Sequence, residues 1–110
     1  MMNAENESNI VVIEFSDLVS NIIDKLQDET LKHEDKNLIL NLEELSAVDD
    51  ELTNSLIKYS KEHKSKNLSF VIVSNVVNLD NEIIDIVPTL QEAYDYIEME
   101  EIERDLGIDF

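Results

Sequence analysis

The sequence predicts a single small α/β domain, with a mixed, mainly parallel sheet of about four strands and helices packed against it. Two short apolar runs, residues 38–42 and 68–73, have the length and composition of strands that are buried on both faces. Between them, Leu52, Leu56 and His63 recur at helical spacing. Strand, helix and strand in this order form a βαβ unit. The chain has 110 residues, of which 43% are hydrophobic, and this is enough for one core.

The first elements of the chain fit the same pattern. Residues 1–9 are polar and acidic and are expected to be disordered. Residues 10–15 are rich in β-branched side chains and predict the first strand. Ser16 is the expected N-cap of a helix whose apolar residues recur as far as Leu26, and this helix is expected to fade near residues 27–30.

The connections around the second strand are polar. Residues 31–37 are expected to be a connector that leads into this strand, and residues 43–47 a loop that leaves it. Ser46 or Asp49 is the expected N-cap of the helix that follows, since serine and aspartate both favour that position.

The last part of the chain predicts one more strand and one more helix. Residues 74–82 read as a loop and residues 83–87 as a strand. Pro88 ends the strand, and Thr89 caps an acidic helix that covers about residues 90–106.

This last helix carries apolar residues on two nearly opposite sides. The first stripe consists of Leu90, Ala93, Tyr94 and Ile97, and the second of Met99, Ile102 and Leu106. One straight helix cannot bury both stripes against one sheet. The simpler expectation is a bend near residues 98–100 that packs the second stripe inside the molecule; the alternative is a partner that covers it. We assign the α/β domain to residues 10–97 and an acidic helical extension to residues 98–110.

The net charge excludes several classes of partner. The chain has 26 acidic and 8 basic residues, and its formal net charge is -18. Such a field repels phosphate backbones and anionic lipids, so we expect no nucleic acid and no membrane partner, whereas a basic protein would be attracted. The longest apolar run, residues 10–13, is too short to span a membrane. The expected localisation is cytoplasmic.

The residue types that most catalytic sites need are scarce. His33 and His63 are the only histidines, they fall on different elements, and the chain has no cysteine. Gly107 is the only glycine, which excludes glycine-rich phosphate loops. The sequence therefore predicts no catalytic residue, no metal site and no cofactor. A nuclease or other phosphoesterase that uses carboxylate-bound Mg²⁺ stays open as an alternative, because carboxylates are plentiful.

Three consecutive carboxylates, Asp49, Asp50 and Glu51, form the one positioned cluster of the chain. They lie at the start of a predicted helix, just beyond the end of a core strand. One interpretation is a recognition edge for a partner. The other is ordinary compensation of the helix dipole, for which acidic residues are favoured.

At this cluster the chain resembles the STAS domain, named for sulphate transporters and anti-sigma factor antagonists. Members carry a hydrophobic residue, an aspartate and a Ser/Thr pair followed by Gly-Leu. Val48 and Asp49 match this pattern, Asp50 and Glu51 stand where the hydroxyl pair would be, and Leu52 replaces the glycine. A partner kinase phosphorylates the second hydroxyl residue in regulatory members. The resemblance therefore implies that Glu51 either mimics a permanently phosphorylated state or marks an inactive site.

The resemblance covers residues 10–97, more in the order of elements than in identities. It implies an interaction module whose partner is a kinase-like anti-sigma factor. Residues 87–93 and 97–107 are also similar to the tail of short, acidic proteins from Bacteroidetes that often carry the name ribonuclease Z. The enzyme of that name needs a histidine-rich metal motif, which this chain lacks, so we do not carry that activity over.

The leading functional hypothesis is a non-catalytic, regulatory protein–protein interaction module. The residues expected to bind the partner are Asp49, Asp50, Glu51, Met99, Ile102 and Leu106. An alternative is an acidic inhibitor, or nucleic-acid mimic, that covers a basic protein surface.

Overall fold

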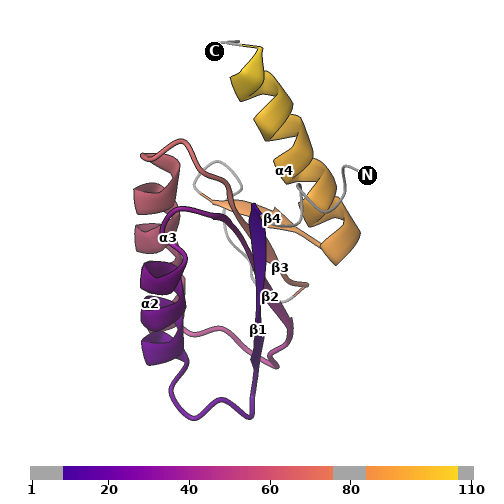
Figure 1. Cartoon of the computed structure of the whole chain (residues 1–110). Helices are drawn as coiled ribbons and strands as arrows, with labels where there is room; N and C mark the ends of the chain where they lie inside the picture. Colours follow the sequence, from indigo (N-terminus) through magenta and orange to yellow (C-terminus); the bar gives the residue numbers. More distant parts are fainter. Residues whose placement is uncertain (1–8, 76–83, 107–110) are drawn as a thin grey trace.

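The computed structural model describes residues 9–75 and 84–106. Within this part of the chain, four strands form one sheet in the order β1-β2-β3-β4. Helices α2 and α3 cover one face of the sheet, and α4 lies against the other (Figure 1). The predicted α/β class is confirmed, and each described pair of neighbouring strands is parallel.

The elements follow one another in a simple alternation. The strands are β1 (Ile10–Ser16), β2 (Asn37–Glu44), β3 (Phe70–Val73) and β4 (Asp85–Val87). The helices are α2 (Ile22–Lys32), α3 (Asp50–Lys64) and α4 (Leu90–Asp105). Parallel strands need a crossover connection, which α2 and α3 supply for the first two strand pairs. The predicted loop between β3 and β4 lies largely outside the described residues, as do the predicted disordered N-terminus up to residue 8 and the chain from residue 107.

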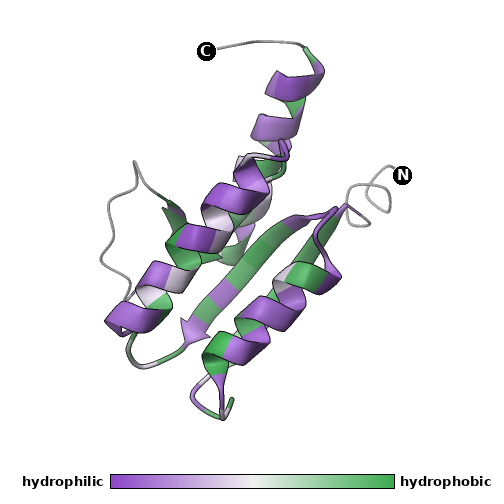
Figure 2. Cartoon of the chain, turned by 90° about the vertical axis from the view of Figure 1, so that its left-hand side faces the viewer, coloured by the Kyte–Doolittle hydropathy of each residue, from purple (hydrophilic) through white to green (hydrophobic). Residues whose placement is uncertain are grey.

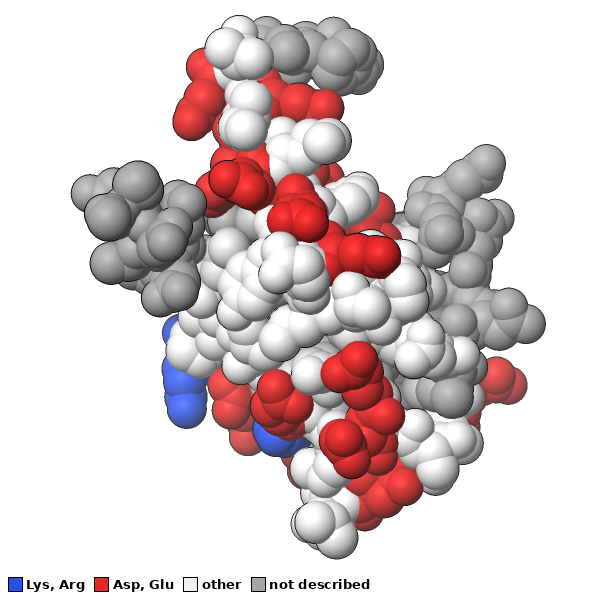
Figure 3. Space-filling view, turned by 90° about the vertical axis from the view of Figure 1, so that its right-hand side faces the viewer, with Lys and Arg blue, Asp and Glu red and all other residues white. Residues whose placement is uncertain are grey.

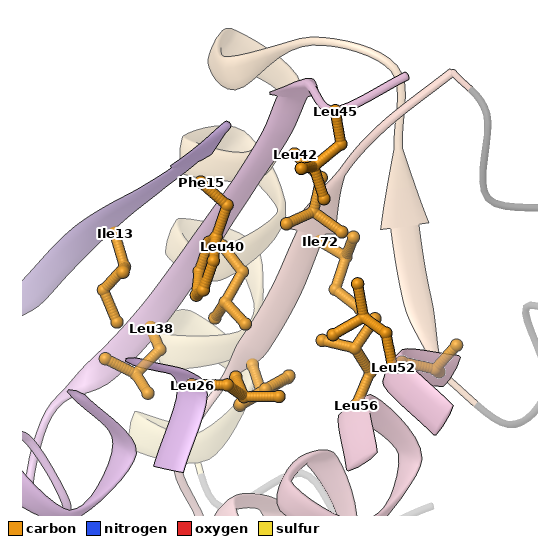
Figure 4. Packing of buried hydrophobic residues seen from close by; sticks show 12 residues of the cluster. Ile13, Phe15, Leu26, Leu38, Leu40, Leu42, Leu45, Leu52, Leu56 and Ile72 are labelled. Carbon is orange, nitrogen blue, oxygen red and sulfur yellow. The ribbon is translucent and has the colours of Figure 1, made fainter. Parts of the chain in front are cut away.

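The middle strands β2 and β3 are buried on both faces. The apolar cluster under α2 and α3 contains Ile13, Phe15, Leu26, Leu38, Leu40, Leu42, Leu45, Leu52, Leu56, Phe70, Ile72 and Ile84 (Figure 4). The cluster under α4 contains Ile39, Val71, Val73, Ala93 and Ile97. Successive strand residues alternate between the two clusters, as a side-chain period of two requires. Burial on both faces explains why the apolar runs are nearly continuous, and Figure 2 shows these hydrophobic strands behind the polar outer sides of α2 and α3.

The predicted start of the first helix is wrong. Ser16 does not cap a helix but ends β1, where it pairs with Glu44 of β2. The N-cap is Asn21, whose side chain accepts a hydrogen bond from the Asp24 N–H (3.2 Å). Leu18 lies in the loop before α2 and is 94% exposed. The extra ladder pairing of β1 with β2 outweighs the local capping preference of serine.

The predicted end of this helix is also wrong. Instead of fading near residues 27–30, α2 continues to Lys32. Leu26 and Thr30 are both buried, and the Thr30 hydroxyl donates a hydrogen bond to the Leu26 carbonyl. Burial of these two side chains thus favours a helix that continues beyond the predicted end.

β2 is longer than predicted at both ends. It begins at Asn37, the last residue of the expected connector, whose N–H donates to the Asn9 carbonyl (2.9 Å). It continues to Glu44, inside the loop expected over residues 43–47, because β1 extends far enough to pair with it.

The predicted N-cap of α3 is confirmed for one of its two candidates, Asp49. Its inward side carries the buried Leu52, Leu56 and His63, as the helical spacing predicts. β3 is shorter than predicted, because the N–H of Leu68 donates to the His63 carbonyl (3.3 Å) and closes the turn after α3.

The bend expected near residues 98–100 does not occur. α4 is capped by Thr89, as predicted, and continues without interruption to Asp105. Ile97 of the first stripe is buried against the sheet, whereas Met99 of the second stripe is 63% exposed. The last turns of α4 project beyond the sheet in Figures 1 and 2.

His63 is a core residue of α3. Its ring is buried, its Nε2–H donates to the Lys36 carbonyl (2.5 Å), and its edge packs on Phe70 with ring centroids 5.8 Å apart. Burial lowers the pKa of His63 below its ordinary value, and the nearby charge of Lys66 lowers it further, while the bond to Lys36 opposes them. The neutral ring is therefore the form that the fold accommodates.

The buried ring predicts a pH dependence of stability. In the unfolded chain His63 takes up a proton below about pH 6.5, whereas in the folded protein it stays neutral to lower pH. Its contribution to stability is thus present above about pH 6.5 and is lost as the pH falls toward the lowered pKa. Because many carboxylates also titrate, the test compares the wild type with His63→Gln by urea denaturation at about pH 7.5 and about pH 5.5.

We expect the wild type to lose more stability between these two pH values than His63→Gln does. His33→Gln serves as the matched control, since His33 is only partly buried. Parallel losses in the wild type and in His63→Gln would contradict the prediction.

Candidate protein-interaction site

The predicted carboxylate cluster lies at the carboxyl edge of the sheet. Parallel strands end at the same edge, so the loop from β1 to α2 and the loop from β2 to α3 lie side by side there. A hydrogen bond joins the two loops, from the Ser46 N–H to Asp17 Oδ1 (3.2 Å). Ser46, one of the two predicted helix caps, is thus used to connect loops and not to cap α3.

Asp49 has a structural role within this cluster. Its backbone is extended (φ -88, ψ 177), and its Oδ1 accepts a hydrogen bond from the Leu52 N–H (2.9 Å). This is the geometry of an N-cap, which satisfies a backbone donor that α3 would otherwise leave without a partner. Asp49 therefore serves the fold as the N-cap of α3.

Asp50 and Glu51 are exposed, as Asp49 is, but they lie in the first turn of α3 and differ from Asp49 in their contacts. Within the described chain, neither side chain makes a hydrogen bond or an ion pair. Their charges are favourable next to the positive end of the helix dipole, and they are free to meet a partner.

A hollow of about 320 Å³ lies beside this cluster, between the N-terminal ends of α2 and α3. Its lining residues are Val19, Ser20, Asn21, Ile22, Ile23, Ala47, Asp49 and Leu52. Most of them are apolar, and they come from both loops and both helix starts. Leu18, which is 94% exposed, lies on the first of these loops. The carboxyl edge therefore combines a hollow of mixed polar and apolar lining with exposed carboxylates.

The other predicted partner-binding residues lie at the opposite end of the molecule. Glu101 of α4 accepts a hydrogen bond from Asn37, which begins β2 (2.6 Å), so the second half of α4 lies beyond the amino ends of the strands. Met99, Ile102 and Leu106 belong to this half. The structure thus separates the six predicted residues into two surfaces that cannot form one continuous contact.

A chain of polar contacts connects α3 and α4 at the edge strand β4. Lys64 Nζ lies 2.6 Å from Asp85 Oδ2, and the Tyr96 hydroxyl donates to Asp85 Oδ1 (2.7 Å). Burial raises the pKa of Tyr96 above its ordinary value, and the hydrogen bond to Asp85 raises it further, so Tyr96 acts as a hydrogen-bond donor. The three residues lie on three different elements, and no local pattern in the sequence connects them.

Among residues 9–75 and 84–106, no three side chains of the histidine, cysteine, aspartate and glutamate types are grouped so that they could hold a metal ion. No helix in the same ranges is long and apolar enough to cross a membrane. No protein-family model matches the chain, and no curated protein matches it.

The capping geometry predicts that Asp49 contributes more to the stability of the fold than Asp50 does. Asp49→Ala should lower the free energy of unfolding by about 1 kcal/mol, because it removes the acceptor of the Leu52 N–H. Asp49→Asn keeps an acceptor and should retain most of the stability. Urea denaturation at neutral pH measures both changes.

Asp50→Ala is the matched control for this prediction. It removes a charge from the same helix end but no hydrogen bond, and it should cost only about 0.3 kcal/mol. Equal losses from Asp49→Ala and Asp50→Ala would rule out the capping role.

Proposed function

We propose that the protein is a non-catalytic, regulatory interaction module that resembles anti-sigma factor antagonists and binds a protein partner through the carboxyl edge of its sheet. The observation that carries the proposal is the position of Asp50 and Glu51, which are exposed beside the hollow between α2 and α3. Loops at the carboxyl ends of parallel strands are where open α/β folds usually bind their ligands.

The chemistry of this edge suits a protein partner. The apolar residues that line the hollow can accept an apolar side chain of a partner, and the carboxylates beside it favour lysine or arginine next to that side chain. The net charge of -18 disfavours nucleic acid and anionic membranes as alternatives. A kinase-like anti-sigma factor is the partner that the resemblance implies, and the proposal places the encounter in the cytoplasm.

The proposed module differs from its phosphorylated counterparts at the position of the modified hydroxyl. Glu51 stands where the resemblance places the phosphorylated hydroxyl, so the negative charge there is permanent. The nearby hydroxyl residues Thr53 and Ser55 lie further into α3 and are partly buried. On this proposal, binding at the carboxyl edge does not depend on a kinase acting on this chain.

The proposal predicts that charge reversal at the edge abolishes binding. The tagged full-length protein and its Asp50→Lys/Glu51→Lys variant are used to capture partners from the native host at low salt, with identification by mass spectrometry. We expect the wild type to retain a kinase-like ATPase or sigma-factor regulator that the variant loses, because two favourable charges become repulsive. Circular dichroism checks that the variant is folded.

A second variant controls for the change in net charge. Asp28→Lys/Glu62→Lys reverses two exposed carboxylates on the outer sides of α2 and α3, away from the carboxyl edge. It should retain the partner. If both variants lose the same proteins, or if basic nucleic-acid-binding proteins are retained by all three versions, the acidic-mimic alternative replaces the proposal.

A further inference from the structure

The second half of α4 presents an apolar stripe to solvent. Met99 is 63% exposed, Ile102 is 53% exposed and Leu106 is 68% exposed. These three residues are spaced i, i+3 and i+7, which places them in one narrow row along the helix. Such spacing is that of the a and d positions through which one helix packs against another.

Polar contacts hold this part of the helix so that the stripe faces outward. The Ser69 hydroxyl donates to Glu100 Oε1 (2.5 Å), and Asn37 Nδ2 donates to Glu101 Oε2 (2.6 Å). Arg104 Nη2 lies 3.5 Å from the Ser69 hydroxyl as a further donor. All three α4 residues lie on the side of the helix that continues the line of the buried Ile97.

The two residues that bind this part of α4, Asn37 and Ser69, are buried and are hydrogen-bonded to each other. Asn37 is 2% exposed and Ser69 is fully buried, and the Ser69 N–H donates to Asn37 Oδ1 (2.8 Å). Turning the stripe toward the domain would break these bonds and expose buried polar groups without partners. The helix is therefore preformed, and a partner would not need to order it.

The charges beside the stripe indicate what kind of partner fits it. If Met99 and Ile102 are a and d positions, then Glu98, Glu103 and Asp105 fall at the flanking e and g positions, where charges select the partner. All three are negative, and Figure 3 shows the carboxylates along the projecting helix. A second copy of this chain would bring the same charges and be repelled. A basic helix would be attracted.

We propose that the second half of α4 is a docking site for a basic amphipathic helix of a partner protein, whose apolar face covers Met99, Ile102 and Leu106 and whose lysines or arginines pair with the flanking carboxylates. This site is independent of the proposed function at the carboxyl edge, because it lies at the other end of the strands.

The test uses a synthetic helical peptide with leucines at its a and d positions and lysines at its e and g positions. A second peptide carries the same leucines but glutamates at e and g. Fluorescence anisotropy with the full-length protein should show that the lysine peptide binds at least about tenfold more tightly than the glutamate peptide. A tenfold change in affinity requires only a modest difference in electrostatic free energy.

Charge-neutral variants separate this site from general attraction to an acidic protein. Met99→Ser/Ile102→Ser removes the apolar contact and should weaken binding of the lysine peptide about tenfold or more. Leu18→Ser/Leu31→Ser removes two exposed apolar side chains elsewhere, of 94% and 61% exposure, and should leave the affinity unchanged. All variants should retain the melting temperature of the wild type, because every substituted side chain is exposed.

Two results would overturn the proposal. The first is equal affinity of the wild type and of Met99→Ser/Ile102→Ser for the lysine peptide, which would mean that charge alone drives binding. The second is a dimer in analytical ultracentrifugation that Met99→Ser/Ile102→Ser converts to a monomer, which would mean that a second copy occupies the stripe.

Discussion

The structure depends on covering the middle strands of the sheet on both faces. Leu38, Ile39 and Leu40 in β2 are fully buried, and so are Phe70 and Val71 in β3. Successive residues of each strand point to opposite sides, so neither face can be left in water. Two crossover helices cover one face as a consequence of parallel pairing. α4 covers the other and is the only described helix that does so, which fixes the position of its first half.

Much of this arrangement could be predicted from local patterns in the sequence. The buried strands are short apolar runs, and Asp49 and Thr89 are recognisable helix caps because they are capping residues followed by helical periodicity. The start of α2 could not be predicted in this way. Ser16 is also a good capping residue, but its pairing with Glu44 depends on a strand that lies further along the chain.

The straight path of α4 depends on contacts that are remote in sequence. The spacing alone shows that the apolar residues move from one side of α4 to the other, and a bend is the simplest local interpretation of this move. Asn37 and Ser69 decide against the bend, because they bond the inward side of the second half at residues 100 and 101. The carboxylate cluster was likewise predicted at the correct edge of the sheet. The hollow beside it was not, since two separate loops form it.

The separation of the two candidate surfaces has a consequence for assembly. Asp50 and the stripe of Met99 lie at opposite ends of the strands, so a protein bound at one end leaves the other accessible. If both are used, the domain is a short, rigid bridge that brings two partners into one ternary complex. Each partner would then raise the local concentration of the other without touching it. In such a complex the small acidic domain would act through the distance and orientation that it imposes.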